Sequence, residues 1–240
     1  MKTIGLLGGM SWESTVPYYQ IINRTIRERL GGFHSAKILL YSVDFDEVEQ
    51  LQRTNRWDQA GEMLASVAVK LEAAGADFLV LCTNTMHKVA AAIEARVQVP
   101  LLHVTEPTAL AIASAGLRKV GLLGTRFTME QDFYKSRLER NHGLQVLVPS
   151  AIDREIVHRI IFQELVLGKI VESSRVEYRR IIASLISQGA QCIILGCTEI
   201  ALLVSDADAS VPLFDTTALH ARSAALYALG ETDVAYIPAL

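Results

Sequence analysis

Short apolar segments alternate with longer amphipathic segments along the whole chain. Two of the short segments, 78–81 and 192–195, are continuously apolar and end in small polar residues. A short run of this kind is typical of a strand that is buried on both faces of a parallel sheet. Apolar residues three and four positions apart mark the longer segments as helices. The alternation therefore predicts an α/β protein with parallel sheets.

The pattern gives approximate bounds for each element. Strands are expected at 4–8, 37–42, 78–81, 99–103, 119–125, 144–148, 192–195 and 211–215. Helices are expected at 14–30, 57–74, 87–96, 128–141, 153–167, 174–187 and 218–229, and 43–54 is expected to be a loop or a short helix.

The second half of the chain repeats the first. Gly189 lies 114 positions after Gly75, and at this spacing Thr83 corresponds to Cys197. We therefore expect two pseudo-symmetric, doubly wound domains, each with a four-stranded, mainly parallel sheet, that face each other across a cleft. The first would hold residues 1–103 and 215–240, and the second 104–214. Because ligands bind beyond the carboxyl ends of parallel strands, Thr83 and Cys197 would lie on opposite sides of this cleft.

Composition excludes several classes of protein. The net charge of −3 leaves no basic footprint, so nucleic acid is not an expected partner. No apolar run reaches the length of a membrane span, and the first residues lack a signal-peptide pattern, which predicts a cytoplasmic protein. The three cysteines form neither a disulfide framework nor a zinc site. The spacing Gly5-x-x-Gly8-Gly9 is not the dinucleotide fingerprint, although such a turn can bind an anion.

The polar residues after the two repeated strands carry the candidate chemistry. Cys197 follows a glycine at a strand end, where a thiolate can serve as nucleophile or base. Cys192 and Cys82 lie within or directly after apolar runs and are expected to be core residues. Thr83 is a much weaker base than a thiolate, and its hydroxyl could instead cap the next helix.

These motifs resemble those of the aspartate/glutamate racemase family. The likeness rests on Thr83-Asn84-Thr85-Met86-His87, on Gly196-Cys197-Thr198-Glu199 and on the start Gly5-Leu-Leu-Gly-Gly-Met10, and it extends over nearly the whole chain. It is nearest to the enterobacterial subgroup specific for L-aspartate and L-glutamate and to the related broad-specificity amino-acid racemases. The resemblance implies a homodimer that uses no pyridoxal phosphate, metal or other cofactor. It also implies that two groups on opposite faces of Cα remove and return a proton.

One position departs from the family's pattern. The first motif of the family is usually Cys-Asn-Thr, whereas this chain has threonine at position 83. The resemblance therefore implies a Cys197 and Thr83 pair that acts on an acidic amino acid, with unequal treatment of the two enantiomers. Further candidates for substrate binding are Met10, Gln52, Asn84, Thr85, Thr125, Thr198 and Glu199. The basic candidates for the distal carboxylate are Arg53, Arg56, Arg126 and Lys169.

Other functions fit the same residues. A decarboxylase or a cis–trans isomerase of small diacids would use Cys197 alone, and release of carbon dioxide would reveal the decarboxylase. A non-catalytic amino-acid binder would explain the threonine as the loss of a base. A nucleotide-dependent enzyme is the weakest alternative, because the glycine spacing is wrong.

Overall fold

A computed structural model describes residues 1–231 and divides into two compact units. Unit 1 contains Met1–Pro107 and residues 220–231, and unit 2 contains Thr108–Leu219. The sequence placed these boundaries slightly earlier, after residues 103 and 214. The difference arises because both boundaries fall inside helices, α5 (Thr105–Ser114) and α11 (Thr216–Leu229), and not at strand ends. Residues 232–240, which were assigned to the first domain, lie outside the described residues.

Unit 1 alternates strands with helices. Its elements are β1 (Ile4–Gly8), α1 (Trp12–Leu30), β2 (Ile38–Ser42), α2 (Phe45–Arg53), α3 (Trp57–Ala73), β3 (Phe78–Leu81), the 3₁₀ helix η1 (Thr85–Val89), α4 (Ala90–Glu94) and β4 (Leu101–Leu102). The segment 43–54, which was expected to be a loop or a short helix, contains α2, and this helix begins after the capping side chain of Asp44.

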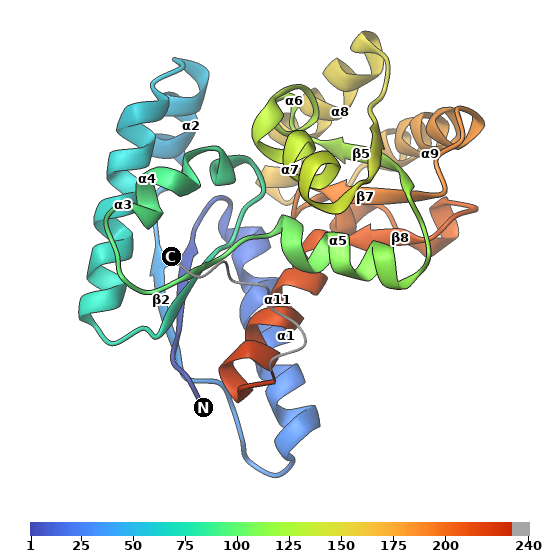
Figure 1. Cartoon of the computed structure of the whole chain (residues 1–240). Helices are drawn as coiled ribbons and strands as arrows, with labels where there is room; N and C mark the ends of the chain where they lie inside the picture. The colour runs from blue at the N-terminus through green and yellow to red at the C-terminus, as the bar shows by residue number, and fades with distance from the viewer. Residues whose placement is uncertain (232–240) are drawn as a thin grey trace. The chain divides into compact units, whose positions relative to one another are not determined.

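The sheet of unit 1 is parallel throughout, in the order β2-β1-β3-β4. Ile4 and Leu6 of β1 pack with α1 and with the alanine-rich face of α11, while α3 packs against β1, β2 and β3 from the other side. Figure 1 shows α3 and α1 on opposite sides of β2. The central strands are therefore buried on both faces, as their apolar sequences predict.

Unit 2 repeats this arrangement. Its elements are β5 (Lys119–Gly124), α6 (Arg126–Glu130), α7 (Asp132–His142), β6 (Gln145–Leu147), α8 (Ala151–Gln163), η2 (Leu165–Leu167), α9 (Glu172–Ser187), β7 (Cys192–Gly196), α10 (Ile200–Leu203), η3 (Asp206–Asp208) and β8 (Leu213–Asp215). The single helix expected at 128–141 is two helices, because Gln131 between them has extended backbone angles.

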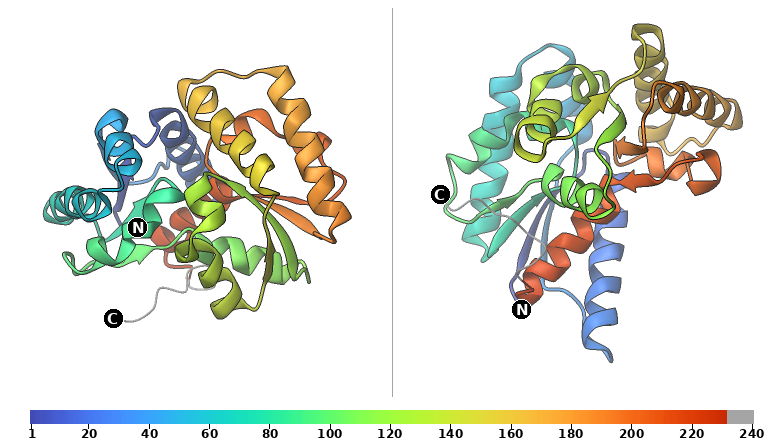
Figure 2. Two further views of the ribbon diagram at one scale, coloured as in Figure 1. Left: turned by 90° about the horizontal axis from the view of Figure 1, so that it is seen from above. Right: turned by 45° about the vertical axis from the view of Figure 1, so that its right-hand side comes forward.

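The sheet of unit 2 has the order β6-β5-β7-β8 and is also parallel. Helices α8 and α9 cover one face through a core that includes Leu123, Ile193 and Leu195. Figure 2 shows α8 and α9 together on one side of the strands of this unit. Two four-stranded parallel sheets with equivalent strand orders confirm the predicted α/β fold class and the internal repeat.

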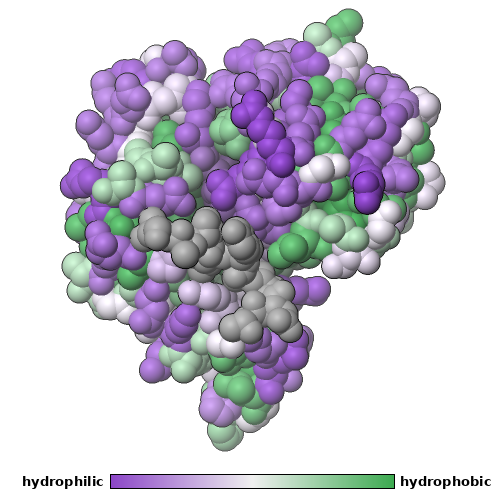
Figure 3. All heavy atoms as spheres, viewed as in Figure 1, coloured by the Kyte–Doolittle hydropathy of each residue, from purple (hydrophilic) through white to green (hydrophobic). Residues whose placement is uncertain are grey.

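None of the helices within residues 1–231 is both long and apolar enough to cross a membrane. The face of each unit seen in Figure 3 is mainly hydrophilic, with small apolar areas between the polar ones. Isolated exposed apolar side chains such as Trp12 and Ile152 are ordinary on protein surfaces.

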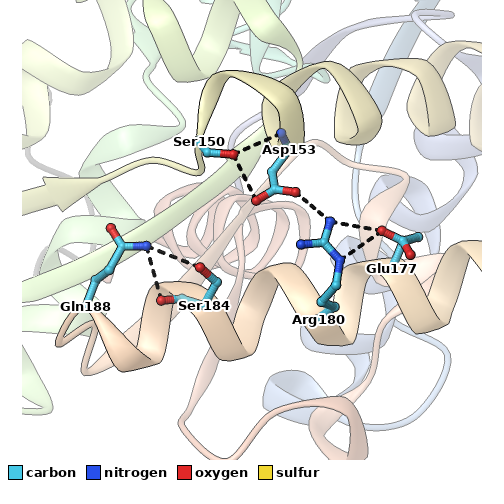
Figure 4. A network of polar contacts seen from close by, with 6 residues as sticks. All are labelled: Ser150, Asp153, Glu177, Arg180, Ser184 and Gln188. Atoms are coloured by element: carbon cyan, nitrogen blue, oxygen red, sulfur yellow. Dashed lines mark hydrogen bonds and ion pairs between the residues drawn. The ribbon is translucent and has the colours of Figure 1, made fainter.

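A polar network joins the start of α8 to α9 (Figure 4). Ser150 Oγ accepts a hydrogen bond from the Asp153 N–H at 3.2 Å and donates to Asp153 Oδ2 at 3.0 Å. The other carboxylate oxygen of Asp153 accepts from Arg180, whose guanidinium also binds Glu177. The hydrogen bond from Arg180 is the main cause that lowers the pKa of Asp153 below its usual value.

We expect Asp153→Asn to destabilise unit 2 by about 1 kcal/mol at pH 7, the scale of one partly exposed ion pair with its hydrogen bonds. A carboxyl group with a lowered folded-state pKa stabilises the fold above its unfolded pKa of about 3.9. This stabilisation is lost as the pH falls through the folded-state pKa. Thermal melts of wild type and variant should therefore differ at pH 7 and converge toward pH 3. Glu62→Gln, at an exposed position, is the control. A difference in melting temperature that persists at pH 3 would contradict the stabilising role of the Asp153 carboxylate.

Candidate active site

The candidate residues of unit 1 gather at the carboxyl edge of its sheet. β1 and β3 pair in parallel with Leu7 opposite Leu81, so the turn after β1 and the residues after β3 leave the sheet at the same edge. Gly9 in that turn has a φ of +91°, and a side chain there would collide with the main chain of Val43. Met10 and Thr83, 3% and 6% exposed, are therefore held at one edge by backbone geometry.

Gln52 of α2 adds a buried carboxamide to unit 1. Its Nε2 donates to the sulfur of Met86 at 2.9 Å. Its Oε1 is buried and has no hydrogen-bond partner among the described residues. A buried acceptor without a donor is costly, so a ligand that donates a hydrogen bond there would be stabilised. An ammonium group is such a donor.

Two histidines near Thr83 have their imidazole nitrogens occupied by neighbouring protein groups. Nδ1 of His87 lies 2.7 Å from the carbonyl oxygen of Thr83, and its Nε2 accepts from the N–H of Val104 at 3.2 Å. Nδ1 of His103 lies 2.7 Å from the hydroxyl oxygen of Thr105. The main chain thus occupies both nitrogens of His87, so this ring holds the backbone and is not poised as a base.

Cys197 of unit 2 follows directly on β7. A Cβ at Gly196 would lie 2.8 Å from the carbonyl oxygen of Leu123, so the strand end requires glycine before the cysteine. The thiol of Cys197 donates to Glu199 Oε2 at 3.0 Å, and the hydroxyl of Thr198 donates to the same oxygen at 2.7 Å. Cys197, Thr198 and Glu199 are all buried.

The electrostatics of this cluster differ from the sequence prediction of a thiolate. Burial, followed by the charge of Glu199, raises the pKa of Cys197 well above its usual value. Cys197 is therefore a thiol in the ligand-free protein, with a carboxylate in place to take its proton. Glu199 was predicted only as a substrate contact, because its role as partner of the thiol depends on side-chain conformation and not on spacing.

Thr125 and Tyr178 complete the surroundings of Cys197. Gly124 pairs with Gly196 across the sheet, which places Thr125 at the same strand edge as Cys197, where its hydroxyl accepts from the N–H of Thr128 at 3.3 Å. Tyr178 of α9 belongs to the same buried cluster as Cys197, and its hydroxyl has no partner in the described part of the chain. No sequence pattern indicates a function for Tyr178, because its spacing marks only a core-facing helix position.

The other two cysteines are core residues. Cys82 is fully buried against α1 and α11, and burial raises the pKa of its thiol. Burial raises the pKa of Cys192 to about 11. Neither thiol is prepared for chemistry.

The four basic candidates differ in position. Arg126 begins α6, next to Thr125, and its guanidinium lies 3.5 Å from Glu155. Arg53 pairs with Glu49 on α2, Arg56 donates to Thr54, and Lys169 is exposed. Of these, Arg126 follows Thr125 at the strand edge that also carries Cys197, and Arg53 follows Gln52 in unit 1.

Comparison with known proteins shows the family of this chain. The family model described as Asp/Glu/Hydantoin racemase matches residues 7–224. The chain belongs to this family. It is therefore an amino-acid racemase, an isomerase, as the motifs around Thr83 and Cys197 indicated.

Individual relatives cover nearly the full length of this family member. A broad-specificity amino-acid racemase of Bacillus subtilis is 26% identical over 92% of this chain and 95% of its own. A crystal structure from Yersinia pestis, described as a candidate Asp/Glu racemase, is 58% identical with a TM-score of 0.89 and covers 95% of this chain and 100% of that one. An aspartate racemase homologue from Pyrococcus horikoshii is 35% identical with a TM-score of 0.81 and covers the same shares.

Proposed function

We propose that the protein racemises acidic amino acids without a cofactor, with Cys197 and Thr83 acting on opposite faces of Cα. The observation that carries the proposal is the buried Cys197 thiol, hydrogen-bonded to the Glu199 carboxylate at the end of β7. Thr83 follows β3, the strand that takes the equivalent place in the sheet of unit 1. In this proposal the two strand ends face one substrate. The homodimer and the cytoplasmic location stay predictions.

Proton transfer begins inside unit 2. The Cys197 thiol passes its proton to Glu199, which gives a thiolate and a carboxylic acid. The thiolate then takes the α-hydrogen, so that Cys197 is again a thiol and the substrate becomes a carbanion whose charge spreads into its carboxylate. On the opposite face, the hydroxyl of Thr83 or a water bound to it donates a proton to Cα. Thr83 regains a proton from water, and Glu199 releases its proton to water and is again a carboxylate. Proton transfer by a positioned side chain raises the rate of a reaction by a factor of roughly 10²–10⁴.

Other groups hold the substrate in this proposal. The unpartnered Oε1 of Gln52 accepts from the ammonium group. Asn84, Thr85, Thr125 and Thr198, with the main chain near Met10, stabilise the charge that grows on the α-carboxylate, which is commonly the largest single contribution to catalysis. Arg126 binds the distal carboxylate, because its exposed pair with Glu155 is weak and easily exchanged.

The test follows deuterium uptake at Cα by NMR across a panel of L- and D-amino acids. We expect uptake on aspartate and glutamate, with other amino acids exchanging more slowly. Arg126→Met should lower uptake on the acidic substrates roughly tenfold or more, because it removes one charge-assisted hydrogen bond, and should leave neutral amino acids unchanged. Lys169→Met is the matched control. Uptake on no amino acid, or release of carbon dioxide from a malonate-type diacid instead, would overturn the proposal.

A further inference from the structure

Three buried histidines lie together in unit 1, and the proposed chemistry uses none of them. His87, His103 and His220 are 3%, 4% and 0% exposed. The ring centroids of His87 and His103 are 4.3 Å apart, and those of His87 and His220 are 6.0 Å apart. They come from η1, from the residue after β4, and from α11, so the cluster lies directly behind the residues that follow β3.

The contacts of His87 define its protonation. A carbonyl oxygen only accepts, so the 2.7 Å contact with Thr83 O places a hydrogen on Nδ1. A main-chain N–H only donates, so the 3.2 Å contact from Val104 leaves a lone pair on Nε2. His87 is therefore a neutral ring that links the main chain at two separate positions.

The other two rings are neutral as well. Nε2 of His220 lies 2.8 Å from Leu102 O and donates to it, and its Nδ1 accepts from the hydroxyl of Tyr18 at 2.9 Å. Burial lowers the pKa of His220 to about 4. Nδ1 of His103 accepts from the N–H of Thr105. A charge on His87 would be buried among these rings, which favours the neutral form that can accept from Val104.

The two main-chain contacts of His87 matter because the pairing of β3 with β4 is short. β3 pairs with β4 through only two register positions, Leu79 with Leu101 and Val80 with Leu102. Beyond these two pairs, Thr83 and Val104 are no longer part of the hydrogen-bonded ladder between the strands. His87 reconnects them, since it binds the carbonyl of Thr83 on one side and the N–H of Val104 on the other.

We infer that His87 is a positioning residue, which fixes the main chain at Thr83 and thereby the place from which the Thr83 hydroxyl returns a proton. This inference rests on the proposed function. It separates His87 from the groups that act at the Cys197 face, because the two main-chain groups that His87 binds, Thr83 O and Val104 N–H, both belong to unit 1. Its loss should therefore affect inversion and spare exchange.

The experiment compares three replacements of His87. His87→Asn keeps an amide N–H near the place of Nδ1 and loses the acceptor for Val104. His87→Gln places an acceptor near Nε2 and loses the donor to Thr83. His87→Ala loses both. His220→Asn is the matched control, because it disturbs the same cluster without touching Thr83.

We expect His87→Ala to lower the ratio of inversion to α-hydrogen exchange about tenfold to a hundredfold, the effect of a displacement near 1 Å. His87→Asn should retain most of this ratio and His87→Gln less of it. His220→Asn should lower the melting temperature and leave the ratio unchanged. If His87→Ala reduces exchange and inversion equally, or if His220→Asn lowers the ratio as much, His87 is only structural and the inference is wrong.

Nitrogen-15 NMR and amide hydrogen exchange separate this inference from the proposed function. We expect the Nδ1–H tautomer at His87, and faster amide exchange at Thr83–Thr85 in His87→Ala than in His220→Asn. An inactive wild type with these two results would refute the proposed function alone. An Nε2–H tautomer, or unchanged amide exchange in His87→Ala, would refute the inference whatever the activity.

Discussion

Cys197→Ala should lower the exchange of the α-hydrogen by a factor of about a thousand or more, because it removes the thiol that is hydrogen-bonded to the Glu199 carboxylate. The fold should persist, since the replacement deletes a single sulfur atom from the edge of the core. Cys192→Ala is the matched control: this thiol is also buried and begins β7, the strand that Cys197 follows, but burial raises its pKa to about 11 and it has no role in the proposal. Exchange by Cys197→Ala at a rate near that of wild type would place the base elsewhere.

The pH dependence of exchange in the Glu199→Gln variant tests the role of Cys197 in a second way. In wild type the proton moves directly from the Cys197 thiol to the Glu199 carboxylate, so the exchange rate should change little with pH near neutrality. Glu199→Gln removes both the acceptor and the charge that helps to raise the pKa of Cys197. Its rate should be low at pH 7 and rise up to about tenfold per pH unit as the thiol ionises to bulk water. Parallel pH profiles for the two proteins would mean that Glu199 does not accept this proton.

Thr83→Ala should lower inversion by about a hundredfold while exchange continues, because a hydroxyl that donates a proton to the second face is lost. Wild type should already be asymmetric: a thiol–carboxylate pair serves one face, whereas a hydroxyl cannot accept a proton comparably. We expect L-aspartate and L-glutamate to exchange faster than they invert, and the D enantiomers to react slowly. Chiral chromatography measures inversion, and NMR measures exchange on the same samples.

Thr83→Cys restores the pair of thiols that is usual in the family. It should raise inversion and narrow the difference between the enantiomers. Thr25→Ala is the control for a buried threonine, since its hydroxyl only donates to the carbonyl of Ile21 in α1. Equal inversion of L and D by wild type, together with no response to Thr83→Cys, would mean that Thr83 is not the second catalytic position.

The repeat made much of the fold accessible from the sequence. Apolar runs at 78–81 and 192–195 could be recognised because strands buried on both faces of a parallel sheet are apolar at every position. The 114-residue spacing alone aligns Thr83 with Cys197, and both residues follow equivalent strands. The sequence predictions differ from the structure where an element or a boundary depends on a few residues. Gln131 interrupts the helix expected at 128–141, and two helices cross the unit boundaries.

The sequence by itself determined the fold class, the family and the two strand ends that carry Thr83 and Cys197, because periodicity and motif spacing are properties of the chain. Only the tertiary structure decided the state of those groups. The thiol of Cys197 is protonated because burial and the Glu199 carboxylate disfavour its anion, and His87 fixes Thr83 through two main-chain contacts. A pKa and a tautomer depend on which groups meet after folding, and Thr83 and Val104 come within reach of one histidine only when β3 and β4 are paired.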